Sequence, residues 1–353
     1  MRGEVSRVVL PFSSAARAPT IYDVARAAGV SHQTVSRYLK GFEGIRPETA
    51  ERVEQALKEL DYRPNMAARS LATSRSHRIG ALVSELLEVG LAKTIQGASD
   101  AARAAGFVLD IVTIDPRDDA AVDRALDLLR HQDLAAILAL SPMDLLKDRI
   151  EAVNFPMPVL LEAQIDESAA QSHSSISDVG LRLLIDHLVE LGHRRFVHVS
   201  GPLDWWASRH RAEAYEDALS AHGLTSVDSI AGSWTAASGF RAGMSMPLDR
   251  GITAVVAGND QMALGILRAL AERGVSVPGD VSVVGFDDIP ESEYYQPPLT
   301  TVRIDYEQQG RILMGGLLSM LGPGEGAPVI PIVPPTLVVR ASSSAAASAS
   351  PRS

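Results

Sequence analysis

The chain of 353 residues has no cysteine, so it has neither a disulfide framework nor thiol chemistry, as is common inside cells. None of its apolar runs approaches the ~20 residues that a helix needs to cross a bilayer. The N-terminal segment is a poor signal peptide, because Glu4 lies early and the apolar patch from Val8 to Phe12 is short and interrupted by Pro11. We therefore expect a cytoplasmic protein whose residues 1–17 form a disordered leader.

Patterns typical of catalysis or metal binding are also missing. The nine histidines have no metal-ligand spacing, and neither a Ser-His-Asp order nor a glycine-rich phosphate loop stands out. Asp287 and Asp288 are adjacent and could form an acid/base pair, but neighbouring side chains at a strand end usually point apart. The sequence therefore predicts a protein that is not an enzyme and needs no cofactor or metal.

The charge is unevenly divided along the chain, although the net charge of −10 looks unsuited to nucleic acid. Residues 1–78 contain 13 Lys and Arg against 8 Asp and Glu, a net charge of +5. The remaining residues contain 20 Lys and Arg against 35 Asp and Glu, a net charge of −15. A basic N-terminal part on an acidic body fits nucleic-acid binding confined to one end.

The stretch that begins at Thr20 predicts a short amphipathic helix. Thr20 can cap the helix with its side chain, and an apolar face follows with i, i+3, i+4 spacing at Ile21, Val24 and Ala25. Gly29 can adopt the positive φ that ends a helix, so the chain turns tightly there. This helix and turn could be the first half of a helix-turn-helix unit.

A second helix is predicted from His32 to about Leu39, with Ser31 as its cap and with Val35 and Leu39 facing inward. In a helix-turn-helix unit the start of this helix enters the major groove, where Gln pairs with adenine and Arg with guanine. The side away from Val35 carries the candidate base-reading residues His32, Gln33, Ser36 and Arg37. A third helix begins at about Pro47, and its apolar positions are Val53, Ala56, Leu57 and Leu60.

Two sequence blocks here, TIYDVARAAGVSHQTVSRYL and LDYRPNMAARSLAT, closely resemble the headpiece of the LacI/GalR family of transcriptional regulators. The resemblance implies a helix-turn-helix headpiece over residues 18–63 and a hinge over residues 64–78, which by itself could also be a plain linker. In that family the leucine that matches Leu71 wedges into the minor groove. We predict DNA contacts from ten residues: Thr20, Ser31, His32, Gln33, Thr34, Ser36, Arg37, Asn65, Ala68 and Leu71.

From Ile79 onward, buried strands alternate with helices, which predicts parallel sheets covered on both faces. Strands are expected over residues 79–84, 107–114, 134–140, 158–163, 195–201, 254–259 and 281–287. Helices are expected over residues 91–105, 120–130, 177–191, 212–221 and 262–273. Two consecutive runs of this kind predict two similar lobes.

The second half repeats the family resemblance in the words HLVELGHRRFVHVSGPL, GSWTAASGF and VVAGNDQMALGILRAL, among others. The resemblance covers about residues 18–340 and implies the two-lobed type I periplasmic-binding-protein fold with a ligand cleft between the lobes. The chain would cross between lobes near Ser175, Ile304 and Pro334. Lobe 1 would then comprise about residues 79–175 and 304–334, and lobe 2 residues 176–303 and 335–340.

Polar residues follow several of the predicted strands, and in parallel sheets such positions face the ligand crevice. Asn259 follows one strand, Asp287 follows another, and Arg211 opens a predicted helix. Asp260 is expected to cap the next helix, and His193 with Arg194 to form a solvated helix end. An Asp, an Asn and an Arg can together bind neighbouring hydroxyls of a sugar.

Trp234 offers an apolar face on which a pyranose can pack, although a lone Trp is more often a core residue. In family members that bind galactosides, the resemblance implies the same residue types at Arg211, Trp234, Asn259 and Asp287. Glu162 stands where that subgroup has an aspartate, which leaves the specificity on that side of the sugar open. Ser84 matches a serine of the first lobe, and these six residues are the predicted ligand site.

The tail from Ala341 to Ser353 is expected to be disordered, because 11 of its 13 residues are Ala or Ser. It has no leucine heptad that would make tetramers, so we expect a homodimer, which can read two half-sites of a palindromic operator. The resemblance implies a transcriptional repressor, nucleoid-associated when bound to DNA, that a galactoside-like sugar releases. Alternatives are a corepressor-dependent regulator of the same family and a sugar-binding transport protein.

Overall fold

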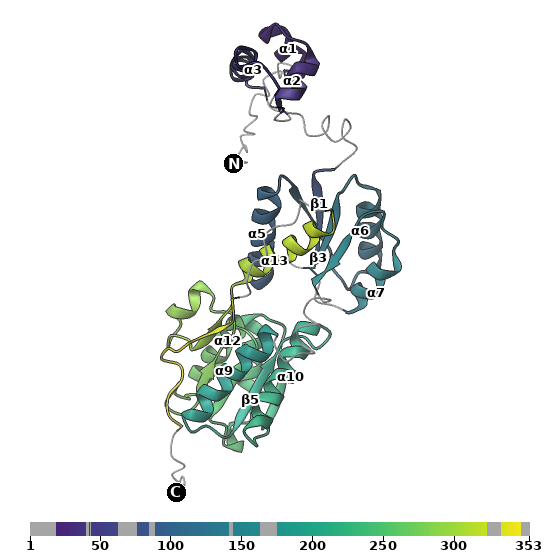
Figure 1. Ribbon diagram of the computed structural model, residues 1–353. Helices are drawn as coiled ribbons and strands as arrows, with labels where there is room; N and C mark the ends of the chain where they lie inside the picture. The colour runs from purple at the N-terminus through teal and green to yellow at the C-terminus, as the bar shows by residue number, and fades with distance from the viewer. Residues whose placement is uncertain are drawn as a thin grey trace, which may run out of the picture. The chain divides into compact units, whose positions relative to one another are not determined.

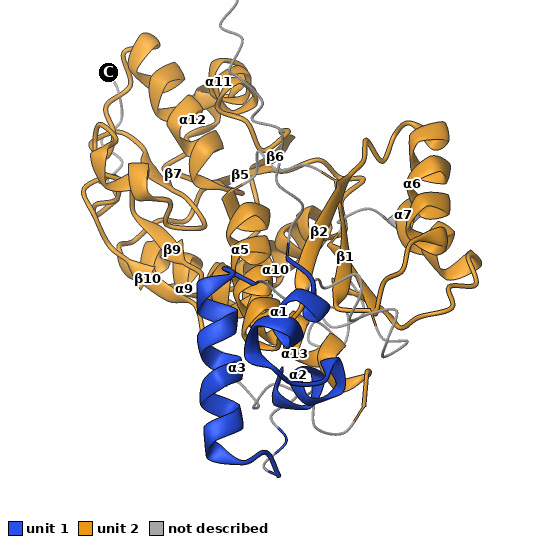
Figure 2. Ribbon diagram, turned by 90° about the horizontal axis from the view of Figure 1, so that it is seen from above, with its two compact units in different colours: residues 1–75 blue, residues 76–353 orange. Residues whose placement is uncertain are grey.

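The computed structural model describes residues 19–39, 42, 44–62, 76–84, 89–140, 144–162, 175–322 and 333–346. The chain forms two compact units, Met1–Arg75 and Ser76–Ser353 (Figure 2). The predicted leader and most of the predicted hinge, including Asn65, Ala68 and Leu71, lie outside the described residues. Within the described ranges, no helix has the length and apolar character needed to span a membrane.

Unit 1 is a three-helix bundle, as the sequence predicted. Its helices are α1 (Ile21–Ala28), α2 (His32–Leu39) and α3 (Pro47–Glu59). The buried core consists of small and branched residues from all three helices: Val24, Ala25, Ala28, Val35, Val53 and Ala56. The prediction that Leu39 faces inward is wrong, because its side chain is 36% exposed and Tyr38 packs against the core instead. Tyr38 lies three residues after Val35, on the same helix face.

The first lobe of unit 2 is a parallel sheet in the order β2-β1-β3-β4. Its strands are β1 (Arg78–Val83), β2 (Val108–Thr113), β3 (Ala136–Leu140) and β4 (Val159–Leu161). Its helices are α5 (Val89–Ala104), α6 (Asp119–His131), α7 (Asp144–Ala152) and α13 (Tyr306–Ser319). Ile79 and Ala81 pack with α5 and α13, whereas Leu82 packs with α6 and α7. Both faces of the sheet are therefore covered.

The second lobe repeats this arrangement with the order β6-β5-β7-β8. Its strands are β5 (Phe196–Ser200), β6 (Asp228–Ala231), β7 (Ala254–Ala257) and β8 (Ser282–Val284). Its helices are α9 (Ile176–Glu190), α10 (Trp206–Ala221), α11 (Ala236–Ser245) and α12 (Asp260–Glu272), with the short η1 (Leu248–Arg250) and η2 (Pro290–Tyr294). Phe196 packs with α9 and α10, and Val197 with α11 and α12. The predicted doubly wound, two-lobed core is thus present.

Helix α13 belongs to the first lobe, although strands of the second lobe precede and follow it. It runs beside α5 (Figure 1), and β9 (Thr301–Arg303) pairs antiparallel with β10 (Thr336–Val338). A Cβ added to Gly97 would lie 1.8 Å from the Glu307 carbonyl oxygen, and one added to Gly310 would lie 1.9 Å from the Thr94 carbonyl oxygen. Only glycine allows this approach, which holds α13 against the first lobe.

The C-terminal segment Ala341–Ala346 is ordered, so the predicted disorder from Ala341 onward is wrong for these residues. Ser342 is fully buried, and its Oγ donates to the Val283 carbonyl at 2.5 Å and accepts from Thr300 N at 2.8 Å. His193 is also buried rather than solvated, with its Nε2 3.0 Å from the Ser344 carbonyl oxygen. A chain of small residues can bind the sheet edge through backbone groups, and composition does not reveal this.

Candidate ligand pocket and nucleic-acid interface

Helix α2 presents the predicted base-reading residues at its exposed start. The Ser31 hydroxyl accepts from Thr34 N at 3.1 Å and caps the helix. Ser31, His32, Gln33 and Arg37 are exposed, and Thr34 and Ser36 are half-buried. Val35, which is fully buried, anchors the opposite side. The helix therefore leaves one polar face open for a groove.

Thr20 holds the start of α1 through hydrogen bonds to Asp23, and its side chain does not extend away from the helix. The Asp23 carboxylate accepts from Thr20 N at 2.8 Å and from Thr20 Oγ1 at 2.6 Å. At the far end, Gly29 has a φ of 64° and lets the chain turn into α2. The sequence predicted both features, a cap at Thr20 that begins α1 and a turn at Gly29 that ends it.

Unit 2 contains a cavity of about 300 Å³ between its two lobes. This volume lies at the lower end of the range of ligand pockets. From the first lobe, Thr94, Leu140 and Glu162 line the cavity together with Tyr306 at the start of α13. The second lobe contributes the largest polar and aromatic side chains: Trp205, Trp206, Arg211, Trp234, Asn259, Gln261 and Asp287.

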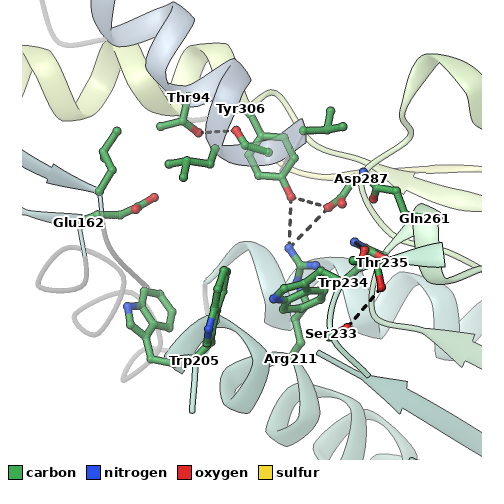
Figure 3. A pocket seen from close by; sticks show the side chains of 17 residues that line it. Thr94, Glu162, Trp205, Arg211, Ser233, Trp234, Thr235, Gln261, Asp287 and Tyr306 are labelled. Carbon is green, nitrogen blue, oxygen red and sulfur yellow. Dashed lines mark hydrogen bonds and ion pairs between the residues drawn. The ribbon is translucent and has the colours of Figure 1, made fainter. Parts of the chain in front are cut away.

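Arg211, Asp287 and Tyr306 form a hydrogen-bonded cluster in this pocket (Figure 3). The Tyr306 hydroxyl donates to Asp287 Oδ1 at 2.5 Å and accepts from an Arg211 Nη at 3.2 Å. Arg211 lies 3.5 Å from the same carboxylate oxygen and also donates to the Gly258 carbonyl at 2.6 Å. Side chains from α10, from α13 and from the segment after β8 are therefore paired with one another in the pocket.

Burial raises the pKa of Asp287, while the Arg211 cation and the Tyr306 hydrogen bond act against that increase. Burial and the Asp287 carboxylate raise the pKa of Tyr306 well above its ordinary value, so its hydroxyl remains a donor. Burial and the nearby Arg211 cation lower the pKa of His198, beneath the pocket, to about 3. The pocket thus places the Arg211 cation beside the Asp287 carboxyl group and a neutral Tyr306 hydroxyl.

The backbone at Trp234 adopts a left-handed conformation with φ of 61°, which is rare for a bulky residue. Its indole lies over the ends of β5 and β7, because a Cβ on Gly201 would come within 2.2 Å of Trp234 Cζ2 and one on Gly258 within 3.2 Å of Cζ3. The guanidinium of Arg211 lies 5.3 Å from the Trp234 ring centroid. Such uncommon backbone conformations persist where function requires them.

Asn259 supports this arrangement with both ends of its amide. Its Nδ2 donates to the Trp234 carbonyl at 3.0 Å, and its Oδ1 accepts from Met262 N at 2.8 Å. Asn259 is therefore the cap of α12, and the prediction that Asp260 takes this role is wrong. The strand β7 ends at Ala257, two residues before its predicted end, and Asn259, whose backbone is extended, is the last residue before α12.

Asp287 and Asp288 point to different partners and do not form an acid/base pair. Asp288 accepts from Arg303 at 2.6 Å and from Arg340 at 2.7 Å, away from the pocket. Burial alone would raise the pKa of Asp288, but these two hydrogen bonds lower it below its ordinary value. Asp288 thus ties the second lobe to the returning C-terminal strand.

Asp260 is fully buried behind the pocket, where its carboxylate accepts from Ile289 N at 2.9 Å and from Thr301 Oγ1 at 2.6 Å. Burial and then the nearby Asp287 carboxylate raise the pKa of Asp260 well above its ordinary value. A carboxyl group with a raised folded-state pKa stabilises the fold most at low pH. That contribution is lost as the pH rises from the unfolded pKa, ~3.9, through the folded pKa.

Asp260→Asn is therefore expected to increase the free energy of unfolding at pH 7 and to flatten its decline above pH 4. The amide can accept from Ile289 N and donate to Thr301 Oγ1, so both hydrogen bonds remain. Thermal unfolding across pH measures the effect, and each kcal/mol corresponds to about 2–4 °C in Tm for domains of 150–250 residues. A variant less stable than wild type at pH 7 contradicts this account.

Five of the six predicted ligand residues line the pocket, and one does not. Arg211, Trp234, Asn259, Asp287 and Glu162 all line the pocket. Ser84, at the end of β1, is buried but is not among the lining side chains in the described ranges.

Sequence reasoning missed Tyr306, Trp205 and Trp206, which also line the pocket. The two tryptophans follow β5 at its carboxyl end, so the same strand-end rule could have found them. Tyr306 follows a crossing between lobes, and no local signal marks it.

The sequence matches two protein-family models and is similar to characterised regulators. Residues 20–65 match the family described as bacterial regulatory proteins, lacI family, and residues 185–343 match the periplasmic binding protein-like domain. The lactose operon repressor of Escherichia coli (strain K12) is 34% identical over 327 residues, which make up 91% of this chain and 89% of that protein. These matches confirm the fold and the family resemblance predicted from the sequence.

Solved structures agree with the sequence matches. A crystal structure of the lac repressor dimer bound to operator and the anti-inducer ONPF has a TM-score of 0.76 at 32% identity, covering 93% of this chain and 100% of that one. A complex of the transcriptional regulator CelR with cellobiose has a TM-score of 0.61 at 30% identity, covering 92% of this chain and 99% of that one. Both similarities cover more than nine tenths of this chain, and thus include the helical N-terminal unit as well as the two lobes.

Proposed function

The chain belongs to the lacI family of bacterial regulatory proteins, and from this premise we propose a repressor that a galactoside-like sugar releases from its operator. The observation that carries the proposal is the pocket between the lobes, where Arg211, Asp287 and Trp234 meet. A guanidinium and a carboxylate bind neighbouring sugar hydroxyls, and an indole packs on the C–H face of the ring. This combination suits a pyranose better than a flat aromatic ligand.

The proposal connects the pocket to DNA through the relative position of the lobes. Glu162 and Thr94 reach the pocket from the first lobe, and Arg211 with Asp287 from the second. A sugar that contacts both lobes favours one relative position, and it can shift an equilibrium only by its differential affinity for the two states. We propose that this position determines whether two hinges can fold together on operator DNA.

The proposed assembly is a homodimer that acts in the cytoplasm, on the nucleoid when bound. Two copies of α2 would read the two half-sites of a palindromic operator, as helix-turn-helix dimers do. The solved structure of the lac repressor dimer bound to operator supports this assembly by similarity. Sugar and DNA then act on the same dimer.

Calorimetry with lactose, galactose and related sugars, with and without operator DNA, tests the proposal. A tenfold loss of operator affinity requires about 1.4 kcal/mol of coupling, and operator must weaken sugar binding by the same factor. A sugar that increases operator affinity, or tight binding of a purine instead, would indicate a corepressor-dependent regulator. Absence of DNA binding under all conditions would contradict the repressor function itself.

Leu71→Ala is expected to lower operator affinity by at least tenfold and to reduce DNA bending, while sugar affinity stays unchanged. The reason is that an apolar side chain inserted between base pairs kinks the duplex, and alanine is too short to do so. Bending is measured by the electrophoretic mobility of circularly permuted operator fragments. If bending by the variant equals that by wild type, Leu71 is not the wedge.

A further inference from the structure

The chain contains three tryptophans, and all three line the same pocket. Their side chains are nearly buried, with Trp205 7% and both Trp206 and Trp234 9% exposed. The ring centroids of Trp205 and Trp234 are 6.3 Å apart, and the two ring planes are inclined by 56°. A single pyranose can lie flat on only one of two inclined rings, so Trp205 offers a face that the sugar on Trp234 does not use.

The position of this tryptophan pair in the chain is unfavourable for the helix that follows. Trp205 is the cap residue of α10 and makes no side-chain capping hydrogen bond. Helix caps favour Ser, Thr, Asp or Asn, which can bond a free backbone N–H of the first turn. Trp205 packs in the apolar cluster of the second lobe beside Trp234, so it reaches the pocket from a fixed position, and residues that break a local rule are expected at functional sites.

Trp206 contributes few packing contacts that would stabilise α10. It is the first residue of α10 and contacts the His210 ring at a centroid distance of 4.5 Å. Among the described residues, it belongs to none of the apolar clusters that form the cores of the two lobes. Its burial therefore comes from the pocket region rather than from core packing.

Unpaired polar atoms in this pocket point to a ligand with many hydroxyls. Within the described part of the chain, Trp205 Nε1, Trp234 Nε1 and Gln261 Oε1 are buried without a hydrogen-bond partner. Buried polar groups are normally satisfied, and a hydroxyl can both donate and accept. Figure 3 shows Glu162 and Trp205 on the side of the pocket away from Asp287 and Gln261. Polar and aromatic groups thus occur at both ends.

We propose that Trp205, Trp206 and Glu162 form a second sugar subsite, so that the effector is a disaccharide with two pyranose rings. This inference rests on the proposed function and specifies its ligand. One ring packs on Trp234 beside Arg211 and Asp287, and the second packs on the Trp205–Trp206 pair. Glu162 accepts from hydroxyls of the second ring across the lobe boundary.

The test compares disaccharides with their component monosaccharides: lactose and cellobiose against galactose and glucose. Because every tryptophan lies in the pocket, the whole tryptophan emission of the wild-type protein reports on binding there. For the variants Trp206→Ala and Trp206→Phe, whose emission differs from that of wild type, calorimetry measures the affinities for the same sugars. Leu203→Ala is the matched control, because Leu203 lies in the same loop, is 54% exposed and does not line the pocket. Thermal unfolding establishes that each variant is folded.

We expect at least one disaccharide to bind wild type at least tenfold more tightly than either of its monosaccharides, a difference of about 1.4 kcal/mol. Trp206→Ala should reduce this ratio to near one, Trp206→Phe should keep part of it, and Leu203→Ala should keep all of it. A wild-type ratio near one, or a ratio that Trp206→Ala leaves intact, overturns the second subsite.

Nitrophenyl galactosides distinguish a sugar subsite from an apolar one. If they bind as tightly as the best disaccharide and depend equally on Trp206, the subsite takes an aromatic group, and the disaccharide proposal is wrong. If no sugar of either size binds or changes operator affinity, the proposed function fails as well. Monosaccharide binding without a disaccharide preference overturns only the present inference.

Discussion

Asp287→Asn is expected to lower sugar affinity by about 10- to 100-fold and to leave a repressor that stays on its operator when sugar is added. The carboxylate is 7% exposed and lies in the pocket beside Arg211. Hydrogen bonds to charged groups contribute ~1.5–3 kcal/mol, and the loss of a buried acceptor leaves its partners unpaired. The amide keeps the size of the side chain, so the fold is less disturbed than by alanine.

Calorimetry measures the affinity, and a filter-binding assay with and without sugar measures release from DNA. Asp217→Asn is the matched control, because Asp217 is exposed on α10 and does not line the pocket. Sugar affinity within a few-fold of wild type would remove Asp287 from the ligand site. Loss of operator binding in the absence of sugar would show that the variant disturbs the fold.

Arg37→Ala should weaken binding to the preferred operator by about 10- to 100-fold, because a good bidentate base contact contributes ~1–3 kcal/mol of discrimination. Arg37 is exposed near the start of α2 and lies 5.6 Å from the Phe42 ring centroid, which limits its freedom. His32 and Gln33 occupy the same exposed side. Together they are predicted to determine which operator is chosen.

Titration of the operator and of random DNA at the same salt concentration separates reading of bases from contact with phosphates. Random DNA should lose less affinity than the operator on substitution of Arg37. Arg26→Ala, at an exposed position on α1, is the matched control and should change both affinities only slightly. An equal loss on both DNAs would mean that Arg37 contacts phosphate alone.

The sequence predicted the headpiece well because its signals are local. A cap at Ser31, a positive φ at Gly29 and buried Val24 and Val35 each follow from neighbouring residues. Leu39 was placed wrongly because at the end of a short helix two adjacent residues compete for the core, and the larger Tyr38 packs there. Helical period alone cannot decide between them.

The pocket was predicted in part, for a different reason. Asp287 follows β8, Arg211 lies in α10, the helix after β5, and parallel strands bring their carboxyl ends to one edge. Tyr306 reaches the pocket only because Gly97 and Gly310 let α13 lie against α5, a tertiary contact without local signal. Likewise, the ordered segment Ala341–Ala346 depends on pairing with a distant strand, which composition cannot reveal.

The Tyr306 hydroxyl has a consequence for the concentration at which the protein can respond. It donates to Asp287 and accepts from Arg211, the two groups that are proposed to bind a sugar hydroxyl. An incoming sugar must exchange hydrogen bonds rather than add them, and a net intramolecular bond contributes only ~0.5–1.5 kcal/mol. We therefore expect a sensor with a high threshold, which ignores traces of sugar and responds when the sugar is abundant enough to be consumed.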